Sequence, residues 1–149
     1  MATMKSKGKW IYDAHPSVLF RAPGTAALTA TGTTTALALN PLVDAYWDNG
    51  EQPNRELTIA VNVESADATA NDETYVLSAE VSGDGFTTSY QVAHIVLPRG
   101  NAIGCWTVIV DMDDVQRYGT MTQIRLKATL GGTTPSLAFA AWMVEADAS

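Results

Sequence analysis

Apolar and polar residues alternate along most of this chain, and a period of two is typical of β-strands with one buried face. The segment 56–64 is the clearest case, because its odd positions from Leu57 to Val63 are aliphatic and its even positions are polar or small. A helical period is nowhere sustained, and only one helical turn is expected, from Asp113 to Tyr118. Further strands are expected over 17–21, 27–39, 74–82, 86–97, 104–111, 121–130 and 136–145.

These strands are short and evenly spaced, with turn residues about every 8–12 positions. The spacing predicts an all-β fold, an antiparallel β-sandwich or jelly roll of about eight strands. A length of 149 residues is that of one domain. We assign residues 26–149 to a single sandwich domain and residues 1–25 to an extended N-terminal arm. The longest irregular loop is expected over 40–55.

The composition is that of a folded domain, because 46% of the residues are apolar and only 17% are charged. Cys105 is the only cysteine, which excludes an intrachain disulfide and a zinc site built from cysteines. Asp13 and Pro16 interrupt the apolar residues near the start, so we expect no signal peptide. The uncharged stretch 22–43 is too rich in alanine and threonine to span a bilayer, so no membrane is expected as a partner.

The formal charge of −7 is distributed unevenly along the chain. The first 21 residues carry +3 and the remainder carries −10. An acidic body repels phosphate, so nucleic acid is not an expected partner. The positive arm is suited to an acidic protein surface, including that of another copy of this chain, and the alternative is a solvated, frayed terminus. The basic residues of this part are Lys5, Lys7, Lys9 and Arg21.

The residue types that catalysis requires are not grouped in any recognisable pattern. A serine or cysteine nucleophile needs a base within hydrogen-bond reach, usually a histidine. We expect His94 to be hydrogen-bonded within its strand or at an interface, and His15, which precedes a proline, to lie on the surface. We expect Cys105 to be a small buried side chain. The protein is therefore expected not to be an enzyme and to use no cofactor.

Carboxylates gather in two places, and neither predicts a metal site. Asp111, Asp113 and Asp114 lack the glycine and the distal glutamate of an EF-hand loop, so we expect a solvated turn or a cap for the helix that follows. The polar stretch 67–73 is also expected to be a solvated turn. No metal is therefore expected.

Aromatic side chains are the remaining candidates for binding. Tyr46 and Trp47 fall in the long loop, and Trp10 and Tyr12 fall in the arm. Exposed tryptophan and tyrosine side chains stack on sugars or insert into protein partners, and otherwise they cover the open end of a sandwich. Trp106 and Trp142 fall inside strands and are expected in the core. The candidate partner-binding residues are Lys5, Lys7, Lys9, Trp10, Tyr12, Tyr46 and Trp47.

Two runs of the chain resemble segments of small structural proteins from the heads of tailed phages. The first run, from Asn71 to Phe86, passes from a polar loop into a strand through a Glu-x-Tyr step. The second, from Arg125 to Ser136, combines an Arg-x-x-x-Thr strand with a Gly-Gly-Thr-Thr-Pro-Ser hairpin, and Phe139 and Trp142 follow it. The resemblance covers residues 57–143 and leaves the first fifty or so unmatched.

The members that fit best are capsid cement or decoration proteins of short-tailed phages, which have jelly-roll folds. The resemblance implies a non-enzymatic structural protein on the capsid exterior of a virion assembled in the host cytoplasm. Its implied partners are the major capsid protein and further copies of itself, with a two-fold dimer expected before a trimer. A carbohydrate-binding sandwich that uses Tyr46 and Trp47, and a head–tail connector or tail component, remain as alternatives.

Overall fold

The computed structural model describes residues 5–6, 9–10, 15, 18–39 and 56–144. Eleven strands and one helix lie in these ranges. They are β1 (Lys5–Ser6), β2 (Lys9–Trp10), β3 (Leu19–Arg21), β4 (Gly32–Thr33), β5 (Leu37–Ala38), β6 (Glu56–Ala66), β7 (Thr74–Ser82), β8 (Tyr90–Leu97), β9 (Gly104–Asp111), α2 (Met112–Gln116), β10 (Gln123–Gly131) and β11 (Leu137–Val144).

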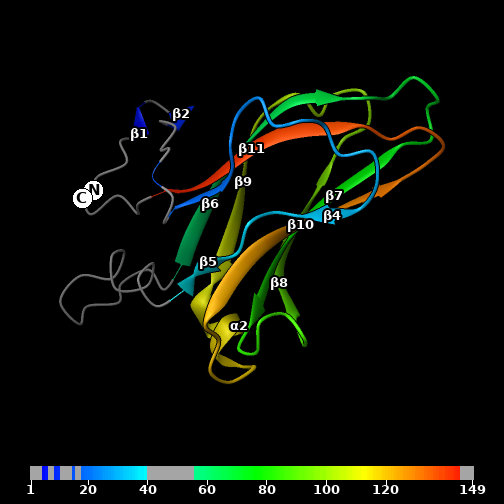
Figure 1. The fold of residues 1–149 in the computed structure, drawn as a ribbon. Helices are drawn as coiled ribbons and strands as arrows, with labels where there is room; N and C mark the ends of the chain where they lie inside the picture. Colours follow the sequence, from blue (N-terminus) through cyan, green and yellow to red (C-terminus); the bar gives the residue numbers. More distant parts are fainter. Residues whose placement is uncertain (1–4, 7–8, 11–14, 16–17, 40–55, 145–149) are drawn as a thin grey trace.

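Strands β3 to β11 form two antiparallel sheets that face each other, so the predicted all-β sandwich is confirmed (Figure 1), and β1 and β2 form a separate two-stranded sheet. One sheet has the order β3-β11-β6-β9, and the other has the order β4-β10-β7-β8, with β5 also paired to β10. Strands β4 and β5 pair with the same side of β10 and together count as one interrupted strand. Counted in this way, and without the separate pair β1 and β2, the sandwich has eight strands. Renumbered from 1 for β3 to 8 for β11, they have the order 1-8-3-6 in one sheet and 2-7-4-5 in the other, which is the jelly-roll arrangement.

The core lies between the inner faces of the two sheets. The aliphatic positions that the alternation predicted in β6, from Leu57 to Val63, are all buried there. Tyr75 and Leu77 face them from β7, as expected from the same alternation. Phe139 joins them from β11 and is fully buried. Strand alternation therefore assigned the inner faces of β6 and β7 correctly, whereas β8 begins at Tyr90, later than the expected segment 86–97.

The helix α2 closes one end of the sandwich, directly after β9 (Figure 1). The Asp111 carboxylate accepts a hydrogen bond of 2.9 Å from the Asp113 N–H, so Asp111 is the N-cap that the sequence suggested as one of two possibilities. Met112 and Val115 are the buried residues of this helix. None of the helical segments among the described residues has the length and hydropathy needed to cross a bilayer.

The segment 18–39 covers the outer edge of β11. Strand β3 pairs with Ala141 and Trp142, and the Met143 N–H donates to the carbonyl of Val18 over 2.7 Å. The Arg21 guanidinium, itself buried, donates to the carbonyl of Phe139 over 2.6 Å and lies 4.7 Å from that ring. This burial lowers the pKa of Arg21, although the charge of Glu64 opposes the shift. One segment thus satisfies the backbone groups that β11 would otherwise leave open.

The same segment covers the outer edge of β10 with threonine hydroxyl groups. Thr34 Oγ1 accepts a hydrogen bond from the N–H of Leu126, and Thr31 Oγ1 accepts one from the N–H of Leu130, both over 3.0 Å. The short strands β4 and β5 pair with β10 on either side of Thr34. The threonine-rich composition of this stretch therefore has a structural role, because its hydroxyl groups replace backbone groups of a regular strand.

Strand β3 lies within residues 1–25, the range that the sequence analysis assigned to an arm. Its backbone pairs with β11 and its central residue, Phe20, is 2% exposed. Residues 18–21 are therefore part of the sandwich. The prediction from periodicity that 17–21 holds a weak strand identified this element, whereas the arm boundary was drawn too late in the chain.

We predict that Phe20→Ala destabilises the protein by about 3–5 kcal/mol, because it removes a fully buried ring from the core. Leu19→Ala, in the same strand but half buried on the outer face, serves as the control and should cost clearly less. Chemical denaturation followed by tryptophan fluorescence measures both. A Phe20→Ala variant as stable as the wild type would show that β3 is not integral to the fold.

Candidate interaction surfaces

The predicted binding residues of the arm are described only in part. Strands β1 and β2 form a separate two-stranded ladder that pairs Lys5 with Trp10 and Ser6 with Lys9. This ladder holds the backbones of three of the seven predicted residues in one unit. The other four, Lys7, Tyr12, Tyr46 and Trp47, lie outside the described residues.

The two runs that carry the resemblance to phage head proteins meet at the end of the sandwich opposite α2, at the right of Figure 1. Tyr75, at the start of β7, donates its hydroxyl proton to the carbonyl of Asp67 over 2.6 Å. The same hydroxyl accepts a hydrogen bond of 3.0 Å from the N–H of Ser136. The Glu-x-Tyr step therefore places a buried hydroxyl between the 67–73 turn and the 131–136 hairpin, and it joins the two.

A second set of bonds joins the same turn and hairpin on the surface. The Asp72 carboxylate accepts from the hydroxyl of Thr133 and, over 3.1 Å, from its N–H. These bonds lower the pKa of Asp72 below its ordinary value of 3.8. Gly132 has a φ of 101°, and a Cβ there would lie 2.7 Å from the carbonyl oxygen of Asp72. Glycine is required at this point because the two chains approach so closely.

Glu73 departs from the expectation of a solvated turn. Its side chain is 1% exposed. One carboxylate oxygen accepts from the N–H of Ala70 over 2.8 Å, whereas the other, Oε2, has no hydrogen-bond partner among the described residues. Arg99 donates to the backbone carbonyl of Glu73 from outside. The turn is therefore a packed corner, and we call residues 67–75 and 131–136 together the turn corner.

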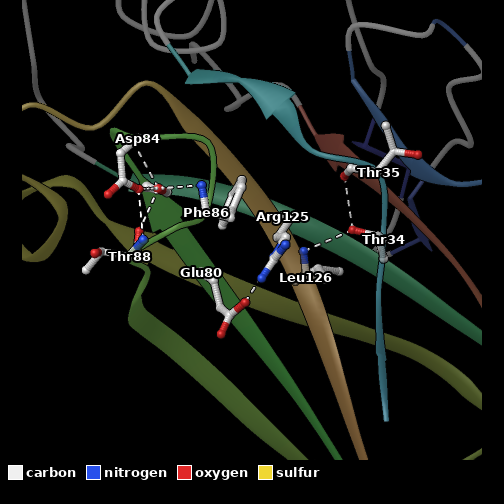
Figure 2. Close-up of polar contacts among 9 residues, drawn as sticks. Thr34, Thr35, Glu80, Asp84, Phe86, Thr88, Arg125 and Leu126 are labelled. Atoms are coloured by element: carbon white, nitrogen blue, oxygen red, sulfur yellow. Dashed lines mark hydrogen bonds and ion pairs between the residues drawn. The ribbon is translucent and has the colours of Figure 1, made fainter. Parts of the chain in front are cut away.

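The outer face of the β4-β10-β7-β8 sheet is polar and carries one aromatic ring. Arg125 on β10 donates to Glu80 on β7 over 3.1 Å, and the Phe86 ring lies over the Arg125 guanidinium at 3.9 Å (Figure 2). Phe86 has a φ of 67°, a conformation that bulky residues rarely adopt. This half-buried ring shields the ion pair from water on one side.

Polar groups in the loop after β7 hold Phe86 in this position. The Ser82 hydroxyl, fully buried, accepts a hydrogen bond from the Phe86 N–H over 2.9 Å, and its oxygen lies within donating distance of both the Thr88 carbonyl, at 2.7 Å, and an Asp84 carboxylate oxygen, at 2.8 Å. Asp84 accepts from the Thr88 N–H over 2.9 Å. This backbone bond, followed by the bond from the Ser82 hydroxyl, lowers the pKa of Asp84. The loop is thus built around the buried hydroxyl of Ser82, and Figure 2 labels Asp84, Phe86 and Thr88 of this loop.

The groups considered for catalysis lie apart from one another. His94 is exposed, with Nδ1 3.3 Å from the Gln91 side-chain amide, and Cys105 contacts the Asn62 side chain. Cys105 is exposed, so the expectation of a buried thiol was wrong. Its side chain alternates away from the core-facing Trp106, on the face that β9 presents to solvent. Histidine, cysteine and acidic side chains of the described ranges form no group of three that could hold a metal ion.

The β3-β11-β6-β9 sheet differs from the other sheet because its outer face is also apolar. Ala60, Ala140, Trp142 and Val144 form a second buried cluster there, and Leu19 packs against it. Trp142 is therefore buried as predicted, but outside the main core. On β9, at the free edge of the same face, Ile109 is 52% exposed. Nearby on the chain, Ile103 is 67% exposed.

Sequence reasoning did not select Ile103 and Ile109 as candidate contact residues, although a signal for Ile109 was present. Ile109 is an aliphatic residue in the polar phase of its strand, where Cys105 and Thr107 are its neighbours on the same face. Val96 on β8 is also exposed, at 65%, but its strand does not alternate clearly and gave no such signal. An apolar residue in the solvent phase of a clearly alternating strand is the pattern to look for.

Comparison with known proteins supplies no relative. No protein-family model matches the chain, no curated protein is significantly similar to it, and no solved structure matches it. The functional argument therefore rests on the residues and on the structure.

We predict that Tyr75→Phe destabilises the protein by about 1–3 kcal/mol, because it leaves the Asp67 carbonyl and the Ser136 N–H buried without their partner. Tyr90→Phe makes the same chemical change where the ring stacks on Tyr118, and it should have little effect. Thermal unfolding of the two variants measures the difference. Equal stability of both would mean that the turn corner does not depend on this hydroxyl.

We predict that Asp72 makes the stability of the protein depend on acid pH. Its folded pKa lies below the unfolded value, so its stabilisation is complete above the unfolded pKa and is lost as the pH falls through the folded pKa. Asp72→Asn should therefore show a smaller fall in melting temperature between about pH 5 and about pH 2. Asp114→Asn is the control for net charge. An identical pH profile for Asp72→Asn and the wild type would contradict the assignment.

Proposed function

We propose that this chain is a non-enzymatic structural protein of a phage capsid, a cement or decoration protein that binds the outside of the shell and ties neighbouring major capsid subunits together. The jelly-roll order of its strands is consistent with this role, as is the position of the two resembling runs. Both runs contribute to the turn corner, where their polar side chains hold loops together. Their role in this structure is therefore architectural.

The observation that carries the proposal is the exposed apolar side chain of Ile109 on β9, the edge strand of the β3-β11-β6-β9 sheet. A sheet in a two-layer sandwich needs one apolar face, for the core. This sheet also has an apolar cluster on its outer face, which is already buried within the chain, and at the edge of the same face Ile109 remains exposed. Exposed apolar residues at a sheet edge are typical of contact surfaces for other proteins. A protein that works by contact needs such a surface and needs no grouped reactive side chains.

The charge distribution supports the same role. The chain before β3 carries Lys5, Lys7 and Lys9 against Asp13 alone, and the rest of the chain is negative, so the two parts favour different neighbours. Positive side chains increase the rate at which a protein meets an acidic surface, and apolar contacts then supply buried area. Many copies on one shell act together, so each contact can be weak. The proposed partners are therefore the major capsid protein and further copies of this chain, on the exterior of the virion.

We predict that the purified protein co-sediments with shells that lack it, and that Lys5→Glu combined with Lys9→Glu weakens this binding at least about tenfold. Reversing two charges in the arm removes its attraction to an acidic shell surface. Quantitative gel densitometry of the pelleted shells, over a titration of added protein, measures both the affinity and the number of copies bound.

The matched control is Arg117→Glu combined with Lys127→Glu, which makes the same change in net charge on the sandwich. It should bind as the wild type does. Equal weakening by both pairs would mean that only net charge matters, and absence of binding by the wild type would contradict the cement role. A glycan array on which Trp47→Ala abolishes a wild-type signal would favour the carbohydrate-binding alternative instead.

A further inference from the structure

Within the described ranges, the sheet edges are covered on one side of the sandwich and unpaired on the other. On one side, the segment 18–39 covers β10 and β11 with strands of two or three residues, threonine hydroxyls and the Arg21 side chain. On the other side, β8 and β9 end their sheets, and within the described ranges no strand pairs with either outer edge. Natural proteins usually protect long edge strands, because an open row of backbone donors and acceptors pairs with another strand.

Of the two open edge strands, β9 is better suited to pair with a strand of another molecule. It pairs with β6 over eight consecutive residues without a register shift. Strand β8, in contrast, has a register shift between the partners of Ala79 and Glu80, and such a bulge disturbs further pairing. The outward side chains of β9 are Cys105, Thr107 and Ile109, none of which carries a charge. The edge therefore lacks the lysine, proline and bulge that prevent strand addition.

Charge indicates which strand can be added. The chain carries −7 overall, so two copies repel each other wherever their carboxylates meet. Strand β9 contains a single charged residue, Asp111, at its last position, where it caps α2. Two copies of β9 can therefore approach along seven uncharged residues before any carboxylate is reached.

From this geometry we infer that β9 is a self-association edge, which pairs antiparallel with β9 of a second copy about a two-fold axis at Thr107. The two four-stranded sheets then become one continuous eight-stranded sheet, in which the outer faces that carry the apolar cluster lie side by side. The inference rests on the proposed function in that it names one of the proposed partners. Its test is made on the free protein in solution, so either proposal can fail alone.

A two-fold axis at Thr107 brings together side chains that face the same side of the sheet, and it also keeps the Asp111 carboxylates apart. Thr107 of each copy lies opposite its counterpart, and Ile109 lies opposite Cys105, so residues facing the same side of the sheet meet. Asp111 lies opposite Ile103, and the two Asp111 residues are about 27 Å apart at the usual rise along a strand. That separation exceeds the Debye length of about 8 Å at physiological salt, so their repulsion is screened.

Sedimentation velocity of the full chain over a range of concentrations tests the inference. We expect a monomer–dimer equilibrium for the wild type, and at least about a tenfold weaker dimer for Ile109→Lys, since a lysine on an edge opposes pairing. Ile109 is 52% exposed, so the substitution leaves the fold of the monomer intact. The matched control is Val96→Lys on the other open strand, where the side chain is 65% exposed and dimerisation should be unchanged.

A second measurement locates the axis. Thr107→Cys in a Cys105→Ser background places two thiols opposite each other, within the Cα separation of about 4.4–6.8 Å that a disulfide requires. We expect mild oxidation to cross-link this variant. The wild type should not cross-link, because its two Cys105 residues are about 14 Å apart. A monomeric wild type, a stronger effect of Val96→Lys than of Ile109→Lys, or cross-linking through Cys105 would each overturn the inference.

Discussion

Backbone hydrogen bonding at the sheet edges is the constraint on which this structure depends. A two-layer sandwich has four edge positions, and every edge strand leaves donors and acceptors that must find partners. On one side a single segment, 18–39, satisfies the edges of both sheets through β3, β4, β5, the Arg21 guanidinium and threonine hydroxyls. One of these bonds joins Arg21 and Phe139, which are 118 positions apart in the sequence. The sandwich is therefore complete only when the segment 18–39 pairs with β11, the last strand in the chain.

The partners that a strand finds outside its own sequence also determine which features of the fold the alternation of apolar and polar residues can predict. A period of two correctly placed the inner faces of β6 and β7, because burial of one face depends on the residues of that strand alone. The burial of Trp142 was predicted, but its position on the outer face of β11, outside the main core, was not, since that depends on what lies over the sheet. The exposure of Cys105 was missed although alternation indicates it, because Cys105 lies in the phase opposite to the buried Val108 and Val110.

The turn corner and the Phe86 loop show a second limit. The Glu-x-Tyr step and the Gly-Gly-Thr-Thr-Pro-Ser hairpin are visible in the sequence, but their contact is made across 61 residues, between Tyr75 and Ser136. A single sequence does not give that pairing. The burial of Glu73 and the positive φ of Phe86 are similarly consequences of tertiary contacts that override local preference. The seven candidate binding residues stay predictions, since the structure describes three of them only as backbone.

A cement role, as proposed here, would make the open side of the sandwich the working part of the molecule. The side covered by 18–39 would provide a stable scaffold, while the β9 edge and the basic arm would supply contacts of different chemistry. Apolar contact is little affected by salt, whereas attraction by the arm weakens as salt screens it. A protein that combines the two can meet a shell through charge and remain bound through many weak contacts.

The measurement that tests the central claim most directly is the number of copies of this chain per purified phage particle. Density-gradient fractions of intact particles, analysed by quantitative gel densitometry, give its ratio to the major capsid protein. The proposed role predicts a ratio near one copy per major capsid subunit, in the same fractions as the shell. A few copies per particle, or none, would contradict the cement role and leave the connector and sugar-binding alternatives.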